Sequence, residues 1–309
     1  MNLTEAIDWA TDQLQSKQIE DARQEAEFLL VHALEINKSE LILNQSLTID
    51  DNSFNRFKAL IERRLKHEPT AYITGIQPFM SLDFIVNRSV LIPRPETELL
   101  VEKIIELVKE KYSPHLSVGN QNIVIADIGT GSGCIAVSLA KFLPNVSVIG
   151  IDSSSKAIEV AKKNAEKHKV SDRCQFMVGN LFDPLKEKAD IIISNPPYIP
   201  SETIKTLQPE VKDWEPRQAL DGGKDGLDYI TKIIREAPNH LPSPSGLRQA
   251  GLTTEPPGSE QSRGTGCLFI EIGFDQGPKV RELAGKYFKG VEVLKDLSGN
   301  DRILRATAA

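Results

Sequence analysis

The chain contains an apolar run, Ala189–Ser194, that stops abruptly at Asn195-Pro196-Pro197-Tyr198. Such a run predicts a buried strand of the kind found inside parallel sheets. Two consecutive prolines cannot donate hydrogen bonds to a neighbouring strand, so the strand has to end before them. Because open α/β sheets bind ligands at the carboxyl ends of their strands, we expect the Asn195 amide and the Tyr198 ring at a binding site.

Three more strands are predicted upstream of this run, alternating with helical patterns. They cover residues 122–127, 146–151 and 174–178. Strands that alternate with helices predict an α/β fold with a doubly wound, mostly parallel sheet. The chain then closes with a strand, a helix and two strand-like runs, at 267–273, 278–287, 291–294 and 302–305.

A glycine-rich turn joins the first predicted strand to a helix predicted at 134–142. Its sequence is Gly129-Thr130-Gly131-Ser132-Gly133. Glycines let the backbone approach a ligand closely, and the N-terminal amides of the helix lie next to the turn. The chain lacks the Gly-Lys-Ser/Thr of a P-loop, and its GxGxG spacing differs from the GxGxxG of dinucleotide sites. Nucleoside triphosphates and nicotinamide cofactors are therefore disfavoured.

Asp152 ends the next strand, about twenty residues after the glycines. An acidic side chain there can accept hydrogen bonds from ribose hydroxyls, which indicates a ligand that contains adenosine. The alternative is that Asp152 only caps the helix that opens at 153–155, but the glycine turn upstream favours ribose binding. After the strand at 174–178, Asn180 and Leu181 place a polar and an apolar residue in succession, which suits the edge and the face of adenine.

Residues 3–66 follow a helical pattern. Leu3, Ile7, Ala10 and Leu14 recur at helical spacing, and similar repeats continue to residue 66. A small helical bundle is therefore predicted over 1–75. Its charged faces can bind a partner, although a solvated surface is the commoner use of such faces.

Residues 76–93 are predicted to be a β-hairpin that links this bundle to a second domain at 94–309. A strand is expected at 82–86, a turn at 87–89 and a second strand at 90–92. The prolines at positions 93 and 95 stiffen the next loop, and Pro95 can begin a helix.

Composition limits the classes of function. The net charge of −6 and the pI of about 5.6 argue against non-specific nucleic-acid binding. The three cysteines, Cys134, Cys174 and Cys267, form no CxxC, and no cysteine and histidine cluster has zinc spacing, so neither a disulfide framework nor a metal site is expected. No basic leader or apolar run of membrane-spanning length is apparent, and we expect a soluble, cytoplasmic protein.

Parts of the second domain lack a strand or helix pattern. Residues 201–226 are irregular, and a loop of this length in a compact domain is usually functional. Residues 240–266 are rich in Pro, Gly and Ser and contain no aromatic residue, which predicts a disordered insertion. A polar surface loop is predicted at 113–121.

Together, Asp127–Gly133, Asp152 and Asn195–Tyr198 resemble the motifs of class I S-adenosylmethionine methyltransferases that act on planar amide or exocyclic nitrogens. Asn-Pro-Pro-Tyr alone leaves DNA adenine methyltransferases open. An enzyme that methylates an adenine or guanine nitrogen in RNA or DNA is therefore the first alternative. The acidic net charge and the lack of an evident nucleic-acid-binding domain argue against it.

Three further phrases, Leu91–Glu98, Glu215–Gly223 and Asp225–Asp228, resemble the release factor glutamine methyltransferase family, and the resemblance covers nearly the whole chain. It implies a Rossmann-like class I domain, S-adenosylmethionine as cofactor and S-adenosylhomocysteine as product. The implied reaction methylates the amide nitrogen (N5) of the glutamine in the Gly-Gly-Gln motif of class I peptide chain release factors and tunes translation termination. The helical domain would help to hold the release factor, and we expect a monomer without nucleic-acid or membrane partners.

The motif matches imply specific site residues. The cofactor-binding residues would be Gly129, Thr130, Gly131, Ser132, Gly133, Asp152, Asn180, Leu181 and Asn195. The catalytic residues would be Asn195, Pro196, Pro197 and Tyr198. The Asn195 side-chain oxygen and the Pro196 carbonyl would accept the two N–H groups of the substrate amide, and Tyr198 would pack against its flat face. A catalytically silent, cofactor-binding partner of release factors remains a second alternative.

Overall fold

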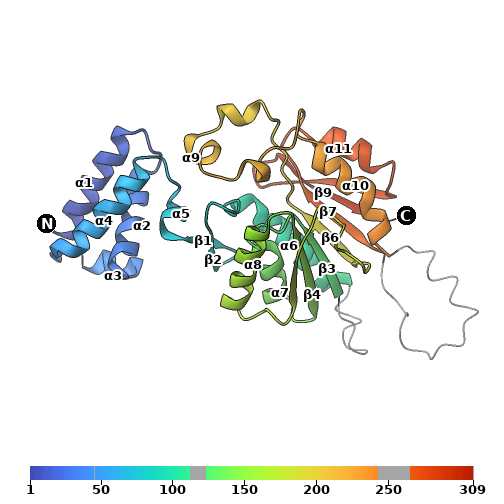
Figure 1. Cartoon of the computed structure of the whole chain (residues 1–309), viewed down its shortest axis with the longest axis horizontal. Helices are drawn as coiled ribbons and strands as arrows, with labels where there is room; N and C mark the ends of the chain where they lie inside the picture. Colours follow the sequence, from blue (N-terminus) through green and yellow to red (C-terminus); the bar gives the residue numbers. More distant parts are fainter. Residues whose placement is uncertain (45, 112–122, 243–264, 309) are drawn as a thin grey trace, which may run out of the picture. The chain divides into compact units, whose positions relative to one another are not determined.

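The computed structural model describes residues 1–44, 46–111, 123–242 and 265–308 (Figure 1). The loop predicted at 113–121 and most of the insertion predicted at 240–266 lie outside the described residues. The chain divides into two compact units. The helical unit consists of Met1–Ile76 and Leu207–Trp214, and the sheet unit consists of Gln77–Thr206 and Glu215–Ala309.

Short helices build the helical unit, as predicted. They are α1 (Leu3–Ser16), α2 (Ala22–Leu34), α3 (Lys38–Leu43), α4 (Asp51–Arg64), α5 (Thr70–Thr74) and α9 (Pro209–Lys212). Asn2 begins α1 with a capping box, in which its side chain accepts the N–H of Glu5 and the Glu5 carboxylate accepts the N–H of Asn2. Fully buried apolar side chains from α1, α2 and α4 form the core of this unit.

The segment Leu207–Trp214 belongs to the helical unit, whereas all of 201–226 was predicted to lie in the second domain. Its Glu210 accepts a hydrogen bond from Arg64 at 3.1 Å, and His67 Nδ1 lies 3.2 Å from the same carboxylate oxygen. Arg64 also donates to Glu25 at 3.2 Å. A buried guanidinium shared by two carboxylates therefore attaches this distant segment to α4 and α2.

The predicted hairpin exists, but the strand expected at 82–86 is its second strand, and its partner lies before it in the chain. β1 (Ile76–Phe79) pairs with β2 (Leu82–Ile85) through a turn at Met80 and Ser81, which both have left-handed φ values of 51° and 57°. Two such residues are typical of a type I′ hairpin turn. The strand predicted at 90–92 is wrong, since the N–H of Ile92 donates to the Glu215 carboxylate at 3.1 Å and no strand forms there.

A seven-stranded sheet forms the second unit, in the order β5-β4-β3-β6-β7-β9-β8. The strands are β3 (Ile123–Ile128), β4 (Val146–Asp152), β5 (Cys174–Val178), β6 (Ile191–Ser194), β7 (Cys267–Glu271), β8 (Gly290–Lys295) and β9 (Asp301–Thr307). β3 to β7 run parallel to one another, and β9 runs antiparallel to β7 and β8. The predicted doubly wound, mostly parallel sheet is confirmed.

Helices cover both faces of this sheet (Figure 1). They are α6 (Pro95–Lys111), α7 (Cys134–Phe142), α8 (Ser155–Lys167), α10 (Asp228–His240) and α11 (Gly277–Ala284). One core cluster joins α6, α7 and α8 to one face, and a second joins α10 and α11 to the other. Within β6, Ile191 and Ile193 belong to the first cluster and Ile192 to the second, as the two-residue period of a strand requires.

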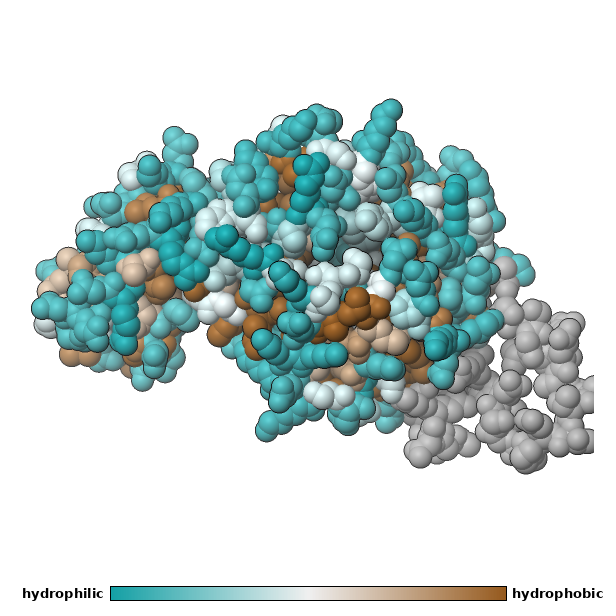
Figure 2. All heavy atoms as spheres, in the orientation of Figure 1, coloured by the Kyte–Doolittle hydropathy of each residue, from teal (hydrophilic) through white to brown (hydrophobic). Residues whose placement is uncertain are grey.

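Hydrophilic residues predominate on the face seen in Figure 2, and hydrophobic ones form small scattered patches. Among the helices of the described residues, none combines the length and the apolar character that crossing a membrane requires.

Candidate active site

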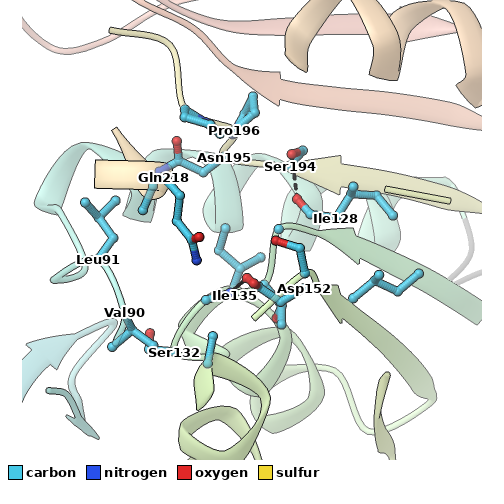
Figure 3. A pocket seen from close by; sticks show the side chains of 18 of the residues that line it. Val90, Leu91, Ile128, Ser132, Ile135, Asp152, Ser194, Asn195, Pro196 and Gln218 are labelled. Carbon is cyan, nitrogen blue, oxygen red and sulfur yellow. Dashed lines mark hydrogen bonds between the residues drawn. The ribbon is translucent and has the colours of Figure 1, made fainter. Parts of the chain in front are cut away.

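The order of the sheet places a crevice at one edge. From β3, the chain continues to β4 on one side, and β6 lies on the other side, so the strand order reverses between β3 and β6. Ligands bind outside the carboxyl ends of the strands at such a switch point. A cavity of about 180 Å³ lies there, within the sheet unit (Figure 3). Of the predicted site residues, it is lined by Gly129, Thr130, Gly131, Ser132, Asp152, Asn180, Leu181, Asn195, Pro196 and Pro197.

The glycine turn after β3 leaves space in front of two of its glycines. Gly129 and Gly131 have φ values of 78° and 55°, which favour glycine. A Cβ built on Gly129 would meet no described atom within 4 Å, and one on Gly131 would meet only the Gly129 carbonyl oxygen, at 4.0 Å. Both glycines therefore keep the backbone open toward the cavity.

Gly133 has a different role from its two neighbours. It does not line the cavity. A Cβ at this position would lie 2.9 Å from the Cβ of Ala161 on α8 and 3.5 Å from the Phe176 ring. Gly133 therefore lets α7 begin close to α8, and its predicted contact with the cofactor stays a prediction.

Asp152 ends β4 and holds two backbone groups at the rim of the cavity. Its Oδ2 accepts the N–H of Gly131 at 2.9 Å, and its Oδ1 accepts the N–H of Ser154 at 2.9 Å. Burial raises the pKa of its carboxyl, and these two hydrogen bonds oppose that rise. Ser154, rather than Asp152, is the N-cap of α8. Asp152 thus fixes the glycine turn, and each carboxylate oxygen keeps a second lone pair that a hydroxyl group can use.

A second carboxyl, that of Asp127, lies behind the turn and is completely buried. Its Oδ2 accepts the Thr130 hydroxyl at 2.6 Å, whereas its Oδ1 has no hydrogen-bond partner among the described residues. Burial, with a smaller contribution from the negative charge of Asp152, raises its pKa to about 7 even though the Thr130 hydrogen bond lowers it. Asp127 lies within the predicted glycine motif, but no role of its own was predicted for it.

Asn180 and Leu181 follow β5 and both line the cavity. Leu181 has a φ of 47°, a conformation that is uncommon for a leucine, and its side chain packs against the second core cluster. The N–H of Asp183 donates to the Asn180 carbonyl at 3.0 Å and closes this turn. A polar and an apolar residue therefore lie next to each other at the cavity, as predicted.

The end of β6 presents Asn195 and Pro196 to the cavity (Figure 3). Ser194 secures this end, since its hydroxyl donates to the Ile128 carbonyl at 2.6 Å. The Asn195 Nδ2 donates to the Thr97 hydroxyl at 3.0 Å. Because the amide nitrogen of Asn195 is used in this way, its Oδ1 is the atom that can accept a hydrogen bond from a ligand.

Tyr198 does not line the cavity. Its ring packs against the second core cluster, and its hydroxyl donates to Glu271 at 3.2 Å. Burial, together with the negative charge of Glu271, raises the pKa of this phenol. Packing of the Tyr198 ring against a substrate amide therefore stays a prediction.

Several residues at the cavity were given no role by the sequence reasoning. Leu91, Arg94, Thr97 and Gln218 all line it. In Figure 3 the Gln218 side chain extends into the space between Asn195 and Asp152. The loop that carries Gln218 returns to the chain that follows β6, because an isolated β-bridge joins Ile199 and Asp221. The available signals were the proline-stiffened loop before α6 and the length of the loop at 201–226.

An ion pair joins these two loops. Arg94 donates a hydrogen bond to Glu215, whose other carboxylate oxygen accepts the N–H of Ile92 at 3.1 Å. The Glu215 side chain is only 1% exposed, so water has little access to its negative charge. The positive charge of Arg94 compensates it. This contact fixes one wall of the cavity.

The site is thus a cavity with an open glycine turn, a carboxylate positioned for hydroxyl groups, and a side-chain oxygen from Asn195. Comparison with family models matches residues 5–75 to the PrmC N-terminal domain and residues 110–208 to the methyltransferase small domain. The release factor glutamine methyltransferase of Geobacter sulfurreducens is 43% identical over 304 residues, which cover 98% of this chain and 95% of that protein. That of Thermodesulfovibrio yellowstonii is 38% identical and covers 91% and 90% of the two chains.

A solved structure shares the fold without close sequence similarity. The hMettl16 catalytic domain in complex with the MAT2A 3′UTR hairpin 6 has a TM-score of 0.51 and 16% identity, with coverage of 85% of this chain and 84% of that one. The sequence relatives, which match at well above 30% identity over nearly the full length, establish the family. The chain belongs to the release factor glutamine methyltransferase family.

Proposed function

We propose that this chain transfers a methyl group from S-adenosylmethionine to the side-chain amide nitrogen (N5) of the glutamine in the Gly-Gly-Gln motif of class I peptide chain release factors. One observation carries the proposal. The Asn195-Pro-Pro end of β6 and the open glycine turn after β3 line a single cavity, in a chain of this family. One wall can therefore hold a planar amide while another holds the methyl donor.

The residues present fit the cofactor. The space in front of Gly129 and Gly131 would be filled by side chains of any other residue type, so the backbone is kept open for a ligand. Asp152 would accept hydrogen bonds from ribose hydroxyls, and Asn180 and Leu181 would contact the edge and the face of adenine. When bound, S-adenosylmethionine supplies an electrophilic methyl group on a positively charged sulfur.

Asn195 and Pro196 would orient the substrate. The lone pair of an amide nitrogen is delocalised into its carbonyl, so the nitrogen is a poor nucleophile. The Asn195 Oδ1 and the Pro196 carbonyl oxygen can each accept one N–H of that nitrogen and direct its lone pair. As the nitrogen gains positive charge these two acceptors hold its N–H groups more strongly, which lowers the barrier selectively. No strong base is needed, because the alkylated nitrogen is acidic and can lose its proton late.

The helical unit would help to bind the release factor. The match of residues 5–75 to the PrmC N-terminal domain supports this assignment. The acidic net charge of −6 favours a protein substrate over a nucleic acid. We propose that the chain acts as a monomer in the cytoplasm.

The test is to incubate the purified chain with methyl-labelled S-adenosylmethionine and, in separate reactions, a class I release factor, tRNA, rRNA or DNA. Label on the glutamine amide of Gly-Gly-Gln is the expected result, and a release factor with that glutamine changed to asparagine is the matched control. Label on nucleic acid alone would overturn the proposal in favour of a nucleobase methyltransferase. Cofactor binding without any transfer would instead indicate a silent partner.

A further inference from the structure

We infer that Thr97 and Glu271 are positioning residues that determine which end of the Asn195 amide faces the substrate, an inference that rests on the proposed function of this site. Neither residue received a role from the sequence. The three side chains come from three elements: Thr97 from the first turn of α6, Asn195 from the end of β6 and Glu271 from the end of β7.

The sheet register places these elements together. β6 and β7 are parallel neighbours in which Ser194 is opposite Ile270, so Asn195, which follows β6, and Glu271, the last residue of β7, lie side by side. Because Pro95 begins α6, Thr97 lies in its first turn, at the carboxyl edge of the sheet. Thr97 and Glu271 are 2% and 1% exposed, so water cannot readily replace either partner.

The hydrogen bonds have a defined direction. The Thr97 hydroxyl donates to Glu271 Oε2 at 2.7 Å and accepts from Asn195 Nδ2 at 3.0 Å. A hydroxyl has one proton, and once that proton is given to a carboxylate oxygen the hydroxyl can only accept from its other neighbour. The carboxylate therefore forces Asn195 to present its NH₂ group to Thr97 and its Oδ1 to the cavity.

The second carboxylate oxygen of Glu271 also accepts a hydrogen bond. Its Oε1 accepts the Tyr198 hydroxyl at 3.2 Å. Burial raises the pKa of this carboxyl, and the negative charge of Glu96 adds a smaller rise, whereas the hydrogen bonds from Thr97 and Tyr198 and the positive charge of Arg302 lower it. Donors on both oxygens keep Glu271 in its role as an acceptor.

The direction matters because an amide substrate needs an acceptor. With Oδ1 toward the cavity, Asn195 can accept an N–H of a glutamine amide. If the Asn195 amide were reversed, its NH₂ group would face the NH₂ group of the substrate, and neither could accept. Oxygen and nitrogen ends have nearly the same shape, so packing alone cannot select the productive one.

The test compares near-isosteric variants of the full-length protein. Thr97→Val removes the hydroxyl, and Thr97→Ser retains it. Glu271→Gln supplies an NH₂ group that can donate to the Thr97 hydroxyl oxygen, so the hydroxyl can give its own proton to Asn195. With a class I release factor as substrate, we expect kcat to fall about 10²-fold for Thr97→Val and Glu271→Gln, as for other misplaced catalytic groups. The dissociation constant for S-adenosylmethionine should not change in these two variants. Thr97→Ser should keep the kcat of the wild type.

Thr11→Val is the matched control for the loss of a buried threonine hydrogen bond. Thr11 is 8% exposed and its hydroxyl donates to the Ile7 carbonyl at 2.8 Å in the helical unit. This variant should lose thermal stability without losing kcat. If Thr97→Val and Glu271→Gln keep the kcat of the wild type and lose only thermal stability, as Thr11→Val does, the inference is wrong.

A spectroscopic measurement makes the test independent of activity. In protein labelled with ¹⁵N-asparagine, the side-chain NH₂ signal of Asn195 is the one that is lost in Asn195→Ala. This signal should shift in Thr97→Val and in Glu271→Gln. It should keep its wild-type position in Thr97→Ser. An Asn195 signal with the same chemical shift in Thr97→Val as in the wild type would overturn the inference. If the variants show these shifts but the wild-type protein methylates no release factor, the proposed function is refuted and the direction of the hydrogen bond stands.

Discussion

Arg64 of α4 and Glu210 of α9 are 146 residues apart in the sequence and form an ion pair with 3.1 Å between Nη1 and Oε1. The Arg64 side chain is 7% exposed and that of Glu210 is 22% exposed. A guanidinium that is buried in this way has to be matched by acceptors, and the second one is Glu25. The pair therefore explains why Leu207–Trp214 belongs to the helical unit.

We predict that Arg64→Met lowers the free energy of unfolding of the helical unit by about 2–3 kcal/mol. Removing one partner of a fully buried pair costs about 3–5 kcal/mol, and here the two carboxylates keep some access to water. Urea unfolding followed by tryptophan fluorescence measures this unit, because both tryptophans, Trp9 and Trp214, lie in it. Arg23→Met removes an exposed pair with Asp8 and should cost about 0–1 kcal/mol. Equal losses for the two variants would contradict the prediction.

The sequence predicts the main features of the sheet unit for a physical reason. Apolar runs that alternate with helices can pack only as a parallel sheet, and the carboxyl ends of such strands meet at one edge. Gly129, Asp152 and Asn195 could therefore be assigned to a single site from their places at the carboxyl ends of three of the strands. Thr97 could not, because it is 98 residues from Asn195 and reaches it only through the packing of α6 on the sheet.

Other residues show where a linear pattern fails. Gly133 has the spacing of a ligand-binding glycine, but its neighbour in space is Ala161, which no motif indicates. Glu210 lies in a stretch without periodicity, so the attachment of that stretch to Arg64 has no signal in the local sequence. A hairpin was predictable between 76 and 93, whereas its register depends on Met80 and Ser81, residue types that rarely occupy left-handed turns.

The two glycines Gly131 and Gly133 should respond differently to alanine. Both have positive φ, so either substitution strains the backbone, by about 1 kcal/mol. Gly133→Ala should lower the melting temperature further, because its Cβ would lie 2.9 Å from the Ala161 Cβ. Gly131→Ala should fold nearly normally and bind S-adenosylmethionine more weakly, because its methyl group projects into open space at the cavity. Calorimetric measurement of both melting and binding separates the two effects, and equal melting temperatures would refute the packing role of Gly133.

Asp152→Ala tests whether this carboxylate binds ribose or only orders the turn. A hydrogen bond to a charged group contributes about 1.5–3 kcal/mol, so the dissociation constant for S-adenosylmethionine should rise about 10- to 150-fold. Ser154→Ala is the matched control, because it removes the N-cap of α8, whose side chain accepts the N–H of Ala157. That variant should lose about 1 kcal/mol of stability and keep its affinity. An unchanged dissociation constant in Asp152→Ala would leave Asp152 with a structural role alone.

Asp127 should make the stability of the sheet unit depend on pH. Burial raises its pKa from 3.8 to about 7. A carboxyl with a higher pKa in the folded chain stabilises the fold below its unfolded pKa, and this contribution is lost as the pH rises through the folded pKa. Relative to Asp127→Asn, the wild type should therefore lose stability between about pH 4 and pH 7, by at most about 1.4 kcal/mol per pH unit. Calorimetric melting of both proteins across this range measures the difference, and parallel curves would show that Asp127 does not titrate there.

Asn195→Ala should strongly reduce methyl transfer and largely keep the binding of S-adenosylmethionine. The variant loses the Oδ1 acceptor that the hydrogen bond between Nδ2 and Thr97 directs toward the cavity. Loss of one such interaction in a transition state costs about 2.7–4 kcal/mol, which corresponds to a fall in kcat of about 10²- to 10³-fold. Single-turnover transfer of a labelled methyl group to a release factor measures the chemical step, and calorimetry measures cofactor binding. Turnover equal to that of the wild type would remove Asn195 from the mechanism, whereas a large loss of cofactor affinity would reassign it to cofactor binding.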